Sequence, residues 1–391
     1  MMDRESEYLL HLLGAYVREE EPEIWPDTDW KRLRHLAYIN NLIGVLDYMA
    51  MSYGICPEEA AASVRRGCMA MISGIAQRTA MAEMLSGELS RQGIDHILMK
   101  GYVLRNYYPV PELRTFGDID LVIRREDRAK SHALMLQLGY RVKNDWEPVY
   151  SYMKPQEHYE LHTELLETDI SDRMDFRRYF RDPWRYAERE GDHCYYFRPA
   201  FHFLYLLVHL AKHIRGSGAG IRLYMDVAVF VRHFGDTLDW NWIRAELEKL
   251  CFTDFAGTVL DFIRRYFGIE SPITPNTADA RTLELLAAFT VSGGVFGRSG
   301  HDSAAMTLKS EKPEASRLGA VFRKLFPAAR TIESRYTYLQ GRPWLLPVAW
   351  IHRLFRTKDA WGQHAREAKD ILEADTEEVR RIRSLYERIG L

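Results

Sequence analysis

Three acidic residues have the types and the spacing of ligands in a divalent-metal site. Asp118 and Asp120 lie two residues apart in the run FGDIDLVI (116–123), and Glu160 lies in EHYELHTEL (157–165). Because side chains alternate across a β-strand, both aspartates are expected on one face, opposite the aliphatic residues. Carboxylates held close together by two strands are hard oxygen ligands for the cations of phosphoryl transfer. An ordinary solvated strand face is the alternative interpretation.

A second set of residues has the chemistry for binding phosphate. Lys100 and Gly101 lie where a strand is expected to turn into a helix, and a glycine there lets backbone N–H groups approach a phosphate. Lys100 adds a positive charge, and Arg105 and Arg114 are candidates for clamping the oxygens of a triphosphate. Gly117, directly before the acidic run, is placed in the same set. For each arginine, surface salt bridging is the alternative.

Four histidines are candidates for substrate contact or for orienting the acids. His158 and His162 share the expected face of Glu160, so either is a candidate general base or orienting partner, with plain exposure as the alternative. His209 and His213 are four residues apart, which places them on one face of a helix. They fit a substrate or phosphate contact, a structural pair, or a zinc site for which no third ligand is obvious.

Arg222 and Asp226 lie one helical turn apart in the stretch RLYMD. Asp226 is a candidate to face the active centre from the helical part of the chain. The interpretation we slightly favour is structural, with Asp226 in a salt bridge to Arg222 across one turn.

The elements that must position these residues follow from apolar periodicity and from turn residues. Helical spacing dominates 1–92 and the chain from Ala200 onward. Between them we predict a strand over 94–99, a helix over 102–108, a loop over 109–115, a strand over 116–123, a helix over 126–138, a strand beginning at Tyr140 and a strand over 157–165. The predicted domains are a helical N-terminal region (1–92), an α/β core (93–170) and a helical C-terminal domain (171–391).

Composition excludes several classes of protein. Of 391 residues, 47% are hydrophobic and 28% are charged, which is typical of a globular chain and excludes disorder over most of it. The 53 basic and 55 acidic residues give a net charge of −2, so no global basic field favours DNA. The first twenty residues mix acids into a short apolar stretch, and no uncharged run reaches the ~20 residues of a membrane span. Four separated cysteines indicate free thiols, so we expect a cytoplasmic protein.

These motifs together resemble a known family. GIDHILMKGYVLRNYYP and PELRTFGDIDLVI, a helix ending in LGY and the later YELHTEL resemble the uncharacterised nucleotidyltransferases of the polymerase-β superfamily. The resemblance runs from Gly93 to Leu165, and it is looser over 202–231. The wider superfamily usually opens its helix with Gly-Ser or Gly-Gly, whereas this chain has Lys-Gly-Tyr.

The resemblance implies an α+β fold, with a polymerase-β-like nucleotidyltransferase core of a small mixed sheet with helices. N-terminal helices and a C-terminal helical domain would flank this core. It implies Asp118 and Asp120 as metal ligands, Glu160 as the third carboxylate, and two Mg²⁺ ions or Mn²⁺ in their place. The implied reaction transfers a nucleoside monophosphate from a nucleoside triphosphate to an acceptor hydroxyl and releases pyrophosphate. The acceptor, whether small molecule, saccharide, protein or RNA, is not identified.

Two other functions remain open at the level of sequence, because a fold does not fix its use. One is a nucleotide-binding or sensing module that does not turn over. The other is a toxin-like enzyme that modifies protein or tRNA.

Two further stretches carry unusual composition. Residues 315–358 hold nine Lys or Arg and one acid, so their net charge is +8 and that of the remaining chain is −10. Contact of this stretch with a membrane surface is one interpretation, and packing of its aromatic residues into the helical domain is the preferred one. Glycines cluster over 293–300, where the absence of a following Lys-Ser/Thr predicts a loop and not a phosphate-binding motif.

Overall fold

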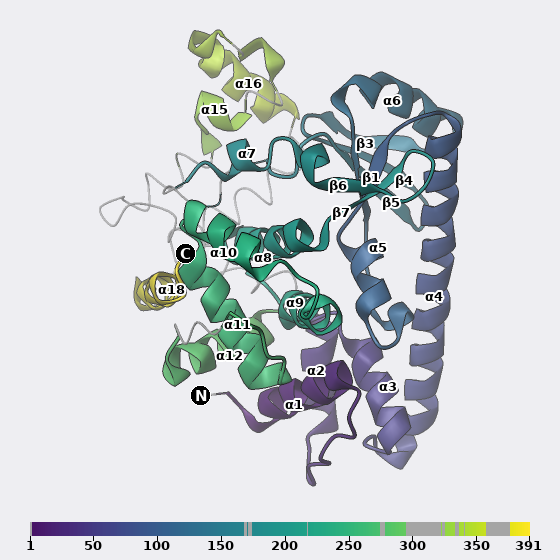
Figure 1. The fold of residues 1–391 in the computed structure, drawn as a ribbon, viewed down its shortest axis with the longest axis vertical. Helices are drawn as coiled ribbons and strands as arrows, with labels where there is room; N and C mark the ends of the chain where they lie inside the picture. Colours follow the sequence, from purple (N-terminus) through teal and green to yellow (C-terminus); the bar gives the residue numbers. More distant parts are fainter. Residues whose placement is uncertain are drawn as a thin grey trace.

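The computed structural model describes residues 2–167, 170, 174–216, 218–273, 278–294, 322, 325–332, 336–339, 341–356 and 376–391. Helices and one mixed sheet make up the described chain (Figure 1). The helices are α1 (Arg4–Arg18), α2 (Trp30–Ile39), α3 (Ile43–Tyr53), α4 (Glu58–Arg91), α5 (Gly101–Leu104), α6 (Arg128–Gln137), α7 (Phe176–Tyr179), α8 (Pro199–Gly216), α9 (Ile221–Phe234), α10 (Trp240–Lys249), α11 (Thr253–Phe267), α12 (Ala280–Gly293), α15 (Ala329–Ile332), α16 (Leu346–Arg356) and α18 (Thr376–Arg388).

The sheet has seven strands in the order β3-β4-β5-β2-β1-β7-β6. They are β1 (His96–Leu98), β2 (Ile119–Ile123), β3 (Arg141–Trp146), β4 (Val149–Lys154), β5 (Glu157–His162), β6 (Ala187–Arg189) and β7 (Cys194–Phe197). The pairs β2–β5 and β1–β7 are parallel, and the other neighbours are antiparallel. The β2–β5 register sets Asp120 directly beside Glu160. The central strands therefore bring the two acidic runs together.

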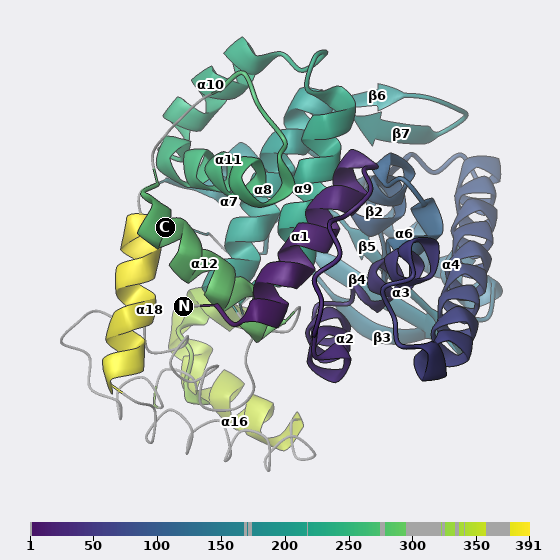
Figure 2. The ribbon, with the colours of Figure 1, turned by 90° about the horizontal axis from the view of Figure 1, so that it is seen from below.

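The two faces of the sheet pack into different cores. Ile119, Leu121 and Ile123 of β2 pack with residues of α4 and α6 in one core. Val122, which points the other way, belongs to a larger core with the helices of both ends of the chain. Figures 1 and 2 show α4 and α6 along one side of the sheet and α8 and α9 on the other. Because side chains alternate along a strand, Asp120 points with Val122 toward the helical side.

Several helices begin where the sequence supplies a side-chain cap. In the described chain Asp3, Asp29, Asp175, Asp239 and Asp279 each accept a hydrogen bond from the backbone N–H three residues further on. These bonds satisfy donors that the first helical turn leaves free. Local sequence therefore fixes many helix starts before any tertiary contact forms.

The structure departs from the expected elements in several places. The helix predicted over 102–108 is only the four residues of α5, followed by a 3₁₀ turn at Arg105–Tyr107. The strand β4 was not predicted, although it supplies the neighbour of β5. β6 and β7 also join the sheet from beyond the predicted core segment. The predicted domain boundaries stay a prediction.

The C-terminal part is described only in pieces. Among the described residues, no helix is both long enough and apolar enough to span a membrane. Gly293 ends α12, whereas Gly297 and Gly300 of the predicted glycine-rich loop lie outside the described residues. Of the basic stretch 315–358, the 3₁₀ turn at Pro343–Leu345 and α16 are described, together with α15 and a few neighbouring residues.

Candidate active site

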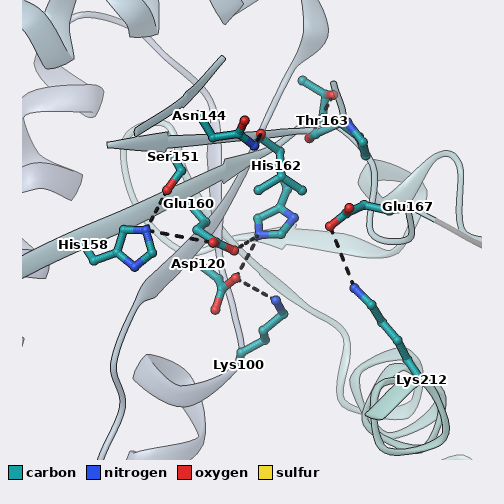
Figure 3. A network of polar contacts seen from close by, with 12 residues as sticks. Lys100, Asp120, Asn144, Ser151, His158, Glu160, His162, Thr163, Glu167 and Lys212 are labelled. Atoms are coloured by element: carbon teal, nitrogen blue, oxygen red, sulfur yellow. Dashed lines mark hydrogen bonds and ion pairs between the residues drawn. The ribbon is translucent and has the colours of Figure 1, made fainter. Parts of the chain in front are cut away.

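Asp120 is the most buried of the three acids. Its side chain is 5% exposed, and Oδ1 accepts hydrogen bonds from Lys100 Nζ at 2.6 Å and His162 Nε2 at 2.8 Å (Figure 3). Burial by itself would raise the pKa of Asp120, but Lys100 and His162 outweigh it and hold that pKa well below its usual range. Asp120 is therefore ionised, while Oδ2 receives no hydrogen bond from the described residues.

Glu160 lies beside Asp120, and its ionised form is less favourable than that of Asp120. Its oxygens are 3.7 Å from His162 Nε2 and 4.0 Å from His158 Nε2, and its side chain is 26% exposed. Burial, together with the charges of Asp120 and Asp118, raises the pKa of Glu160 to about 7. Like charges that share a partly buried site favour a bound cation, because a cation removes the repulsion.

Asp118 completes the acidic cluster from the residue before β2. Ligand atoms of Asp118, His158 and Glu160 lie within 4.8 Å of one another, and so do those of Asp120, Glu160 and His162. Carboxylate oxygens suit Mg²⁺ and Mn²⁺, and the two overlapping groups share Glu160. The donors and the excess of negative charge therefore fit a divalent cation.

The two histidines flanking Glu160 differ in how they are held. His158 Nε2 and Ser151 Oγ of β4 form a 2.6 Å hydrogen bond, so β4 orients this ring. His162 donates to Asp120, while its Nδ1 is buried without a partner among the described residues. Burial lowers the pKa of both imidazoles, and Lys100 adds to the effect at His162. Both rings are therefore mainly neutral at pH 7.

Lys212, His209 and His213 of α8 lie close enough to the acids to interact with the charge of Asp120. Lys212 Nζ is 4.0 Å from Glu167 Oε1, a long pairing that Figure 3 shows beside Lys100 and Asp120. Burial and the ammonium of Lys100 lower the pKa of Lys212. His209 and His213 contact each other edge to face at 4.5 Å. Burial and the neighbouring cations hold the pKa of His213 at about 4 and that of His209 well below its usual value.

Arg222 of α9 adds a further donor on this side. Its Nη1 donates to the carbonyl of Thr115 at 3.0 Å, while Nε is buried without a partner among the described residues. Burial and the nearby Arg114 lower the pKa of Arg222 to about 10. An anion bound between α8, α9 and the acids would relieve the crowding of these cations.

Arg114 and Asp226 form a separate, closed network. Arg114 Nε and Nη2 donate to the two carboxylate oxygens of Asp226 at 3.0 and 2.6 Å, and Tyr108 donates to Oδ1 at 2.7 Å. Arg114 and Asp226 are at most 5% exposed. Asp226 thus forms a buried salt bridge, as in the interpretation that we favoured, but its partner is Arg114 and not Arg222. The guanidinium of Arg114 already forks onto a carboxylate, so its expected role as a phosphate clamp stays a prediction that this contact does not favour.

The Lys-Gly turn is explained by packing. Lys100 has φ +53°, a region that side-chain-bearing residues seldom adopt, and it directly precedes α5. A Cβ on Gly101 would lie 2.5 Å from Arg114 Nη1 and 2.8 Å from Phe116 Cβ. The glycine therefore admits the Arg114 side chain. With only four residues, α5 offers a weak helix dipole for phosphate.

Two other predicted phosphate contacts have different surroundings. Arg105 lies over the ring of Tyr102, which belongs to the core on the α4 side of the sheet, so it is not brought to the acids. Gly117 is exposed, and a Cβ added there would meet nothing within 4 Å. The backbone of Gly117 is held from α4 by Arg78, whose Nη1 is 3.4 Å from the Gly117 carbonyl.

The structure thus brings together the three acids with Lys100, His158, His162, His209, His213 and Arg222. Neither His209 nor His213 belongs to a metal-binding group within the described chain, so a zinc site there is not supported. Sequence reasoning missed Ser151 and Lys212. Lys212 had a visible signal, because it lies three residues after His209 and directly before His213 on the same helix.

A mixed sheet that presents three acids to basic residues of flanking helices defines an α+β protein with a candidate metal and anion site. A family model described as an uncharacterised nucleotidyltransferase matches residues 26–268, so the chain belongs to this family. The predicted fold class is confirmed, with helices flanking a nucleotidyltransferase core. Neither the curated proteins nor the solved structures contain a significant match.

Proposed function

We propose that this protein is a metal-dependent nucleotidyltransferase that moves a nucleoside monophosphate from a nucleoside triphosphate to an acceptor hydroxyl and releases pyrophosphate. The observation that carries the proposal is the convergence of Asp118, Asp120 and Glu160 near two cations, Lys212 of α8 and Arg222 of α9. An acidic cluster binds cations and nearby basic side chains bind phosphate oxygens, and a metal-bound triphosphate needs both.

The three acids would hold the cation. When bound, Mg²⁺ or Mn²⁺ would neutralise phosphate charge and lower the pKa of an acceptor hydroxyl. His162 and Lys100 keep Asp120 ionised and fix the direction of its free oxygen. His158 is oriented by Ser151, and its Nε2 lies 4.0 Å from Glu160 Oε1, so it would stand beside this ligand. These contacts position the ligands before substrate arrives, so less ordering is needed on binding.

The basic side chains would receive the phosphate chain. Lys212 has only a long contact to Glu167, and Arg222 Nε lacks a partner among the described residues, so both have capacity to donate. Lys100 and Arg114 are already engaged by Asp120 and Asp226. We therefore place the triphosphate against α8 and α9 and not in the arginine clamp expected from sequence.

Calorimetric titration tests the proposal directly. ATP, GTP, CTP and UTP are titrated with and without Mg²⁺ into the native chain, into the Asp118→Asn/Asp120→Asn double variant and into Asp192→Asn as an exposed control. We expect Mg²⁺-dependent binding of at least one triphosphate to the native chain and the control, and its loss in the double variant. Equal binding by all three proteins would contradict the metal site.

A non-catalytic nucleotide-binding module is the second candidate, and one contact favours it. The 2.6 Å ion pair between Lys100 and Asp120 neutralises one acid without any metal, so Lys100 competes with a cation for that oxygen. Release of pyrophosphate in the presence of a panel of sugars, small alcohols, peptides and RNA distinguishes the two. Tight triphosphate binding without pyrophosphate from any acceptor would support the module.

A further inference from the structure

An apolar stripe points away from the protein on α16 and the turn before it. Trp344, Val348 and Ile351 are 70%, 53% and 56% exposed, and Pro347 between them is exposed too. The spacing i, i+1 and i+4 places Pro347, Val348 and Ile351 on neighbouring positions of α16, and Trp344 lies in the 3₁₀ turn directly before the helix. The outward side of a helix on a soluble domain is normally polar, so this face is unusual.

The opposite side of α16 accounts for its packing. Ala349 is buried in a small core with Ile332, Tyr336 and Leu339. Trp350 Nε1 donates to the carbonyl of Pro327 at 2.9 Å. Contacts of Ala349 and Trp350 therefore hold the inner side of α16 against neighbouring segments. Our preferred interpretation from sequence, in which the aromatic residues of this stretch pack inward, holds for Trp350 and is wrong for Trp344.

The exposed apolar residues are concentrated here. Phe322, Trp344, Val348 and Ile351 are four of the eleven large hydrophobic side chains that are exposed in the described residues. Figure 1 shows α16 at the opposite end of the molecule from α1, α2 and α3, and Figure 2 also shows it at the periphery. Single exposed hydrophobic residues are ordinary, but a group on one helix face indicates a contact surface.

Charge identifies the partner. Residues 315–358 contain nine basic residues and one acid, whereas the remaining chain has a net charge of −10. Arg342 is exposed next to Trp344 and pairs with no carboxylate of the described residues. A tryptophan and aliphatic residues flanked by arginine match the apolar depth and the negative surface of an anionic bilayer. Nucleic acid fits less well, because Val348 and Ile351 offer it neither charge nor a ring for stacking.

We propose that α16 docks the protein on anionic membrane surfaces. The helix would lie in the plane of the headgroups, with Trp344, Val348 and Ile351 inserted and Arg342 among the phosphates. Its 11 residues are far too few to span the hydrocarbon core. Docking would hold the protein at the lipid–water boundary through α16, and the proposal requires no insertion of the sheet or its acids.

Vesicle co-sedimentation of the full chain tests the docking. The vesicles contain either phosphatidylcholine alone or equal parts of phosphatidylcholine and phosphatidylglycerol. The test variant is Trp344→Ser/Val348→Ser/Ile351→Ser, and the matched control is Met69→Ser/Met84→Ser/Leu136→Ser, which removes three exposed apolar residues from α4 and α6. Circular dichroism checks that both variants are folded.

We expect the native chain and the control to pellet with phosphatidylglycerol vesicles about tenfold more than with phosphatidylcholine. Pelleting should weaken as salt rises from about 0.05 M to about 0.5 M, and the test variant should stay in the supernatant. Equal pelleting on both lipids, or an unchanged test variant, overturns the proposal. So does a native chain that forms dimers or binds RNA through these residues and does not pellet. Nucleotide binding by the test variant is measured in parallel, so that failure here is separate from failure of the proposed enzymatic function.

Discussion

Two buried aspartates, Asp226 and Asp120, have basic partners and yet differ in what surrounds them. Asp226 receives three hydrogen bonds from Arg114 and Tyr108, and both of its oxygens are used. Asp120 receives two, both on Oδ1. Its neighbour on the next strand is the carboxylate of Glu160, whose ionised form is disfavoured by burial and by the nearby acids. One network is satisfied internally, whereas the other has donors, acceptors and charge left for a ligand.

The comparison teaches how to separate a structural ion pair from a functional one. Both pairs are buried, and in both the basic residue had the sequence features of a phosphate contact. Within the Asp226 network the bidentate contact with Arg114 matches the charge of the carboxylate. Around Asp120 like charges crowd together, so that the pKa of Glu160 rises to about 7 and that of Lys212 falls. Such opposed shifts on facing groups are typical of binding sites.

Breaking the closed network should have the largest effect on stability. Arg114→Met leaves the Asp226 carboxylate buried without its cation, so we expect a loss of about 4 kcal/mol in the free energy of unfolding. Urea denaturation measures it, with Arg265→Met as control, because Arg265 and Glu284 form a pair that is exposed on both sides. A loss of triphosphate binding with unchanged stability would instead restore Arg114 as a phosphate clamp.

Breaking the open network should affect function more than stability. Asp120→Asn removes a ligand charge, so we expect transfer to fall about a hundredfold to a thousandfold, which corresponds to about 3–4 kcal/mol. Initial rates of pyrophosphate release measure it. Glu160→Gln sharpens the comparison, because it removes the repulsion among the acids. The Glu160→Gln protein should be more stable than the native chain at neutral pH, while its affinity for Mn²⁺ falls. A loss of stability would contradict the repulsion that we infer among the three acids.

The phosphate-binding role of α8 predicts a smaller effect. Lys212→Met removes one charge-assisted contact to the triphosphate, so KM for the triphosphate should rise about tenfold to a hundredfold. Affinity for Mn²⁺ alone should not fall. Steady-state kinetics and metal titration measure the two quantities, with Lys249→Met as control, because Lys249 is exposed and pairs with Glu246. An unchanged KM would place the phosphates elsewhere.

Asp47 of α3 extends the comparison to an incompletely satisfied carboxylate far from the site. Its side chain is 3% exposed, its Arg34 partner is 3.3 Å away, and Oδ1 is buried without a partner among the described residues. Burial raises the pKa of Asp47 to about 6. The folded protein therefore holds a proton between about pH 4 and pH 6 that the unfolded chain releases, so stability falls as pH rises through this window.

Asp47→Asn removes the free-energy cost of burying a negative charge, and this cost exists only at pH values where Asp47 is ionised. We expect the variant to be more stable than the native chain by about 1–2 kcal/mol at pH 7.5 and equally stable near pH 4. Thermal unfolding at the two pH values measures the difference. Destabilisation at both pH values would show that the pair with Arg34 outweighs the burial of the charge.

Part of the arrangement of the acids could be predicted, because it rests on short-range geometry. The two-residue period of a strand places His158, Glu160 and His162 on one face of β5. Asp118 was expected to share a face with Asp120 in the same way, but it lies directly before β2, so the period applies only to Asp120. The prediction extended the second run too far. β5 ends at His162, and Glu164, which was expected on the same face, pairs with Arg125 and Arg177 instead.

The sequence by itself determined the helix caps, the alternating faces of the central strands and the family to which the chain belongs, because each depends on residues close together in the chain. Only the tertiary structure decided that Arg114 reaches Asp226, 112 residues away, while Lys212 is left to face the acids. Long basic side chains choose partners by which distant segments pack against them. Local spacing does not determine which distant segments pack together. That packing is what distinguishes the closed Arg114–Asp226 pair from the site around Asp120.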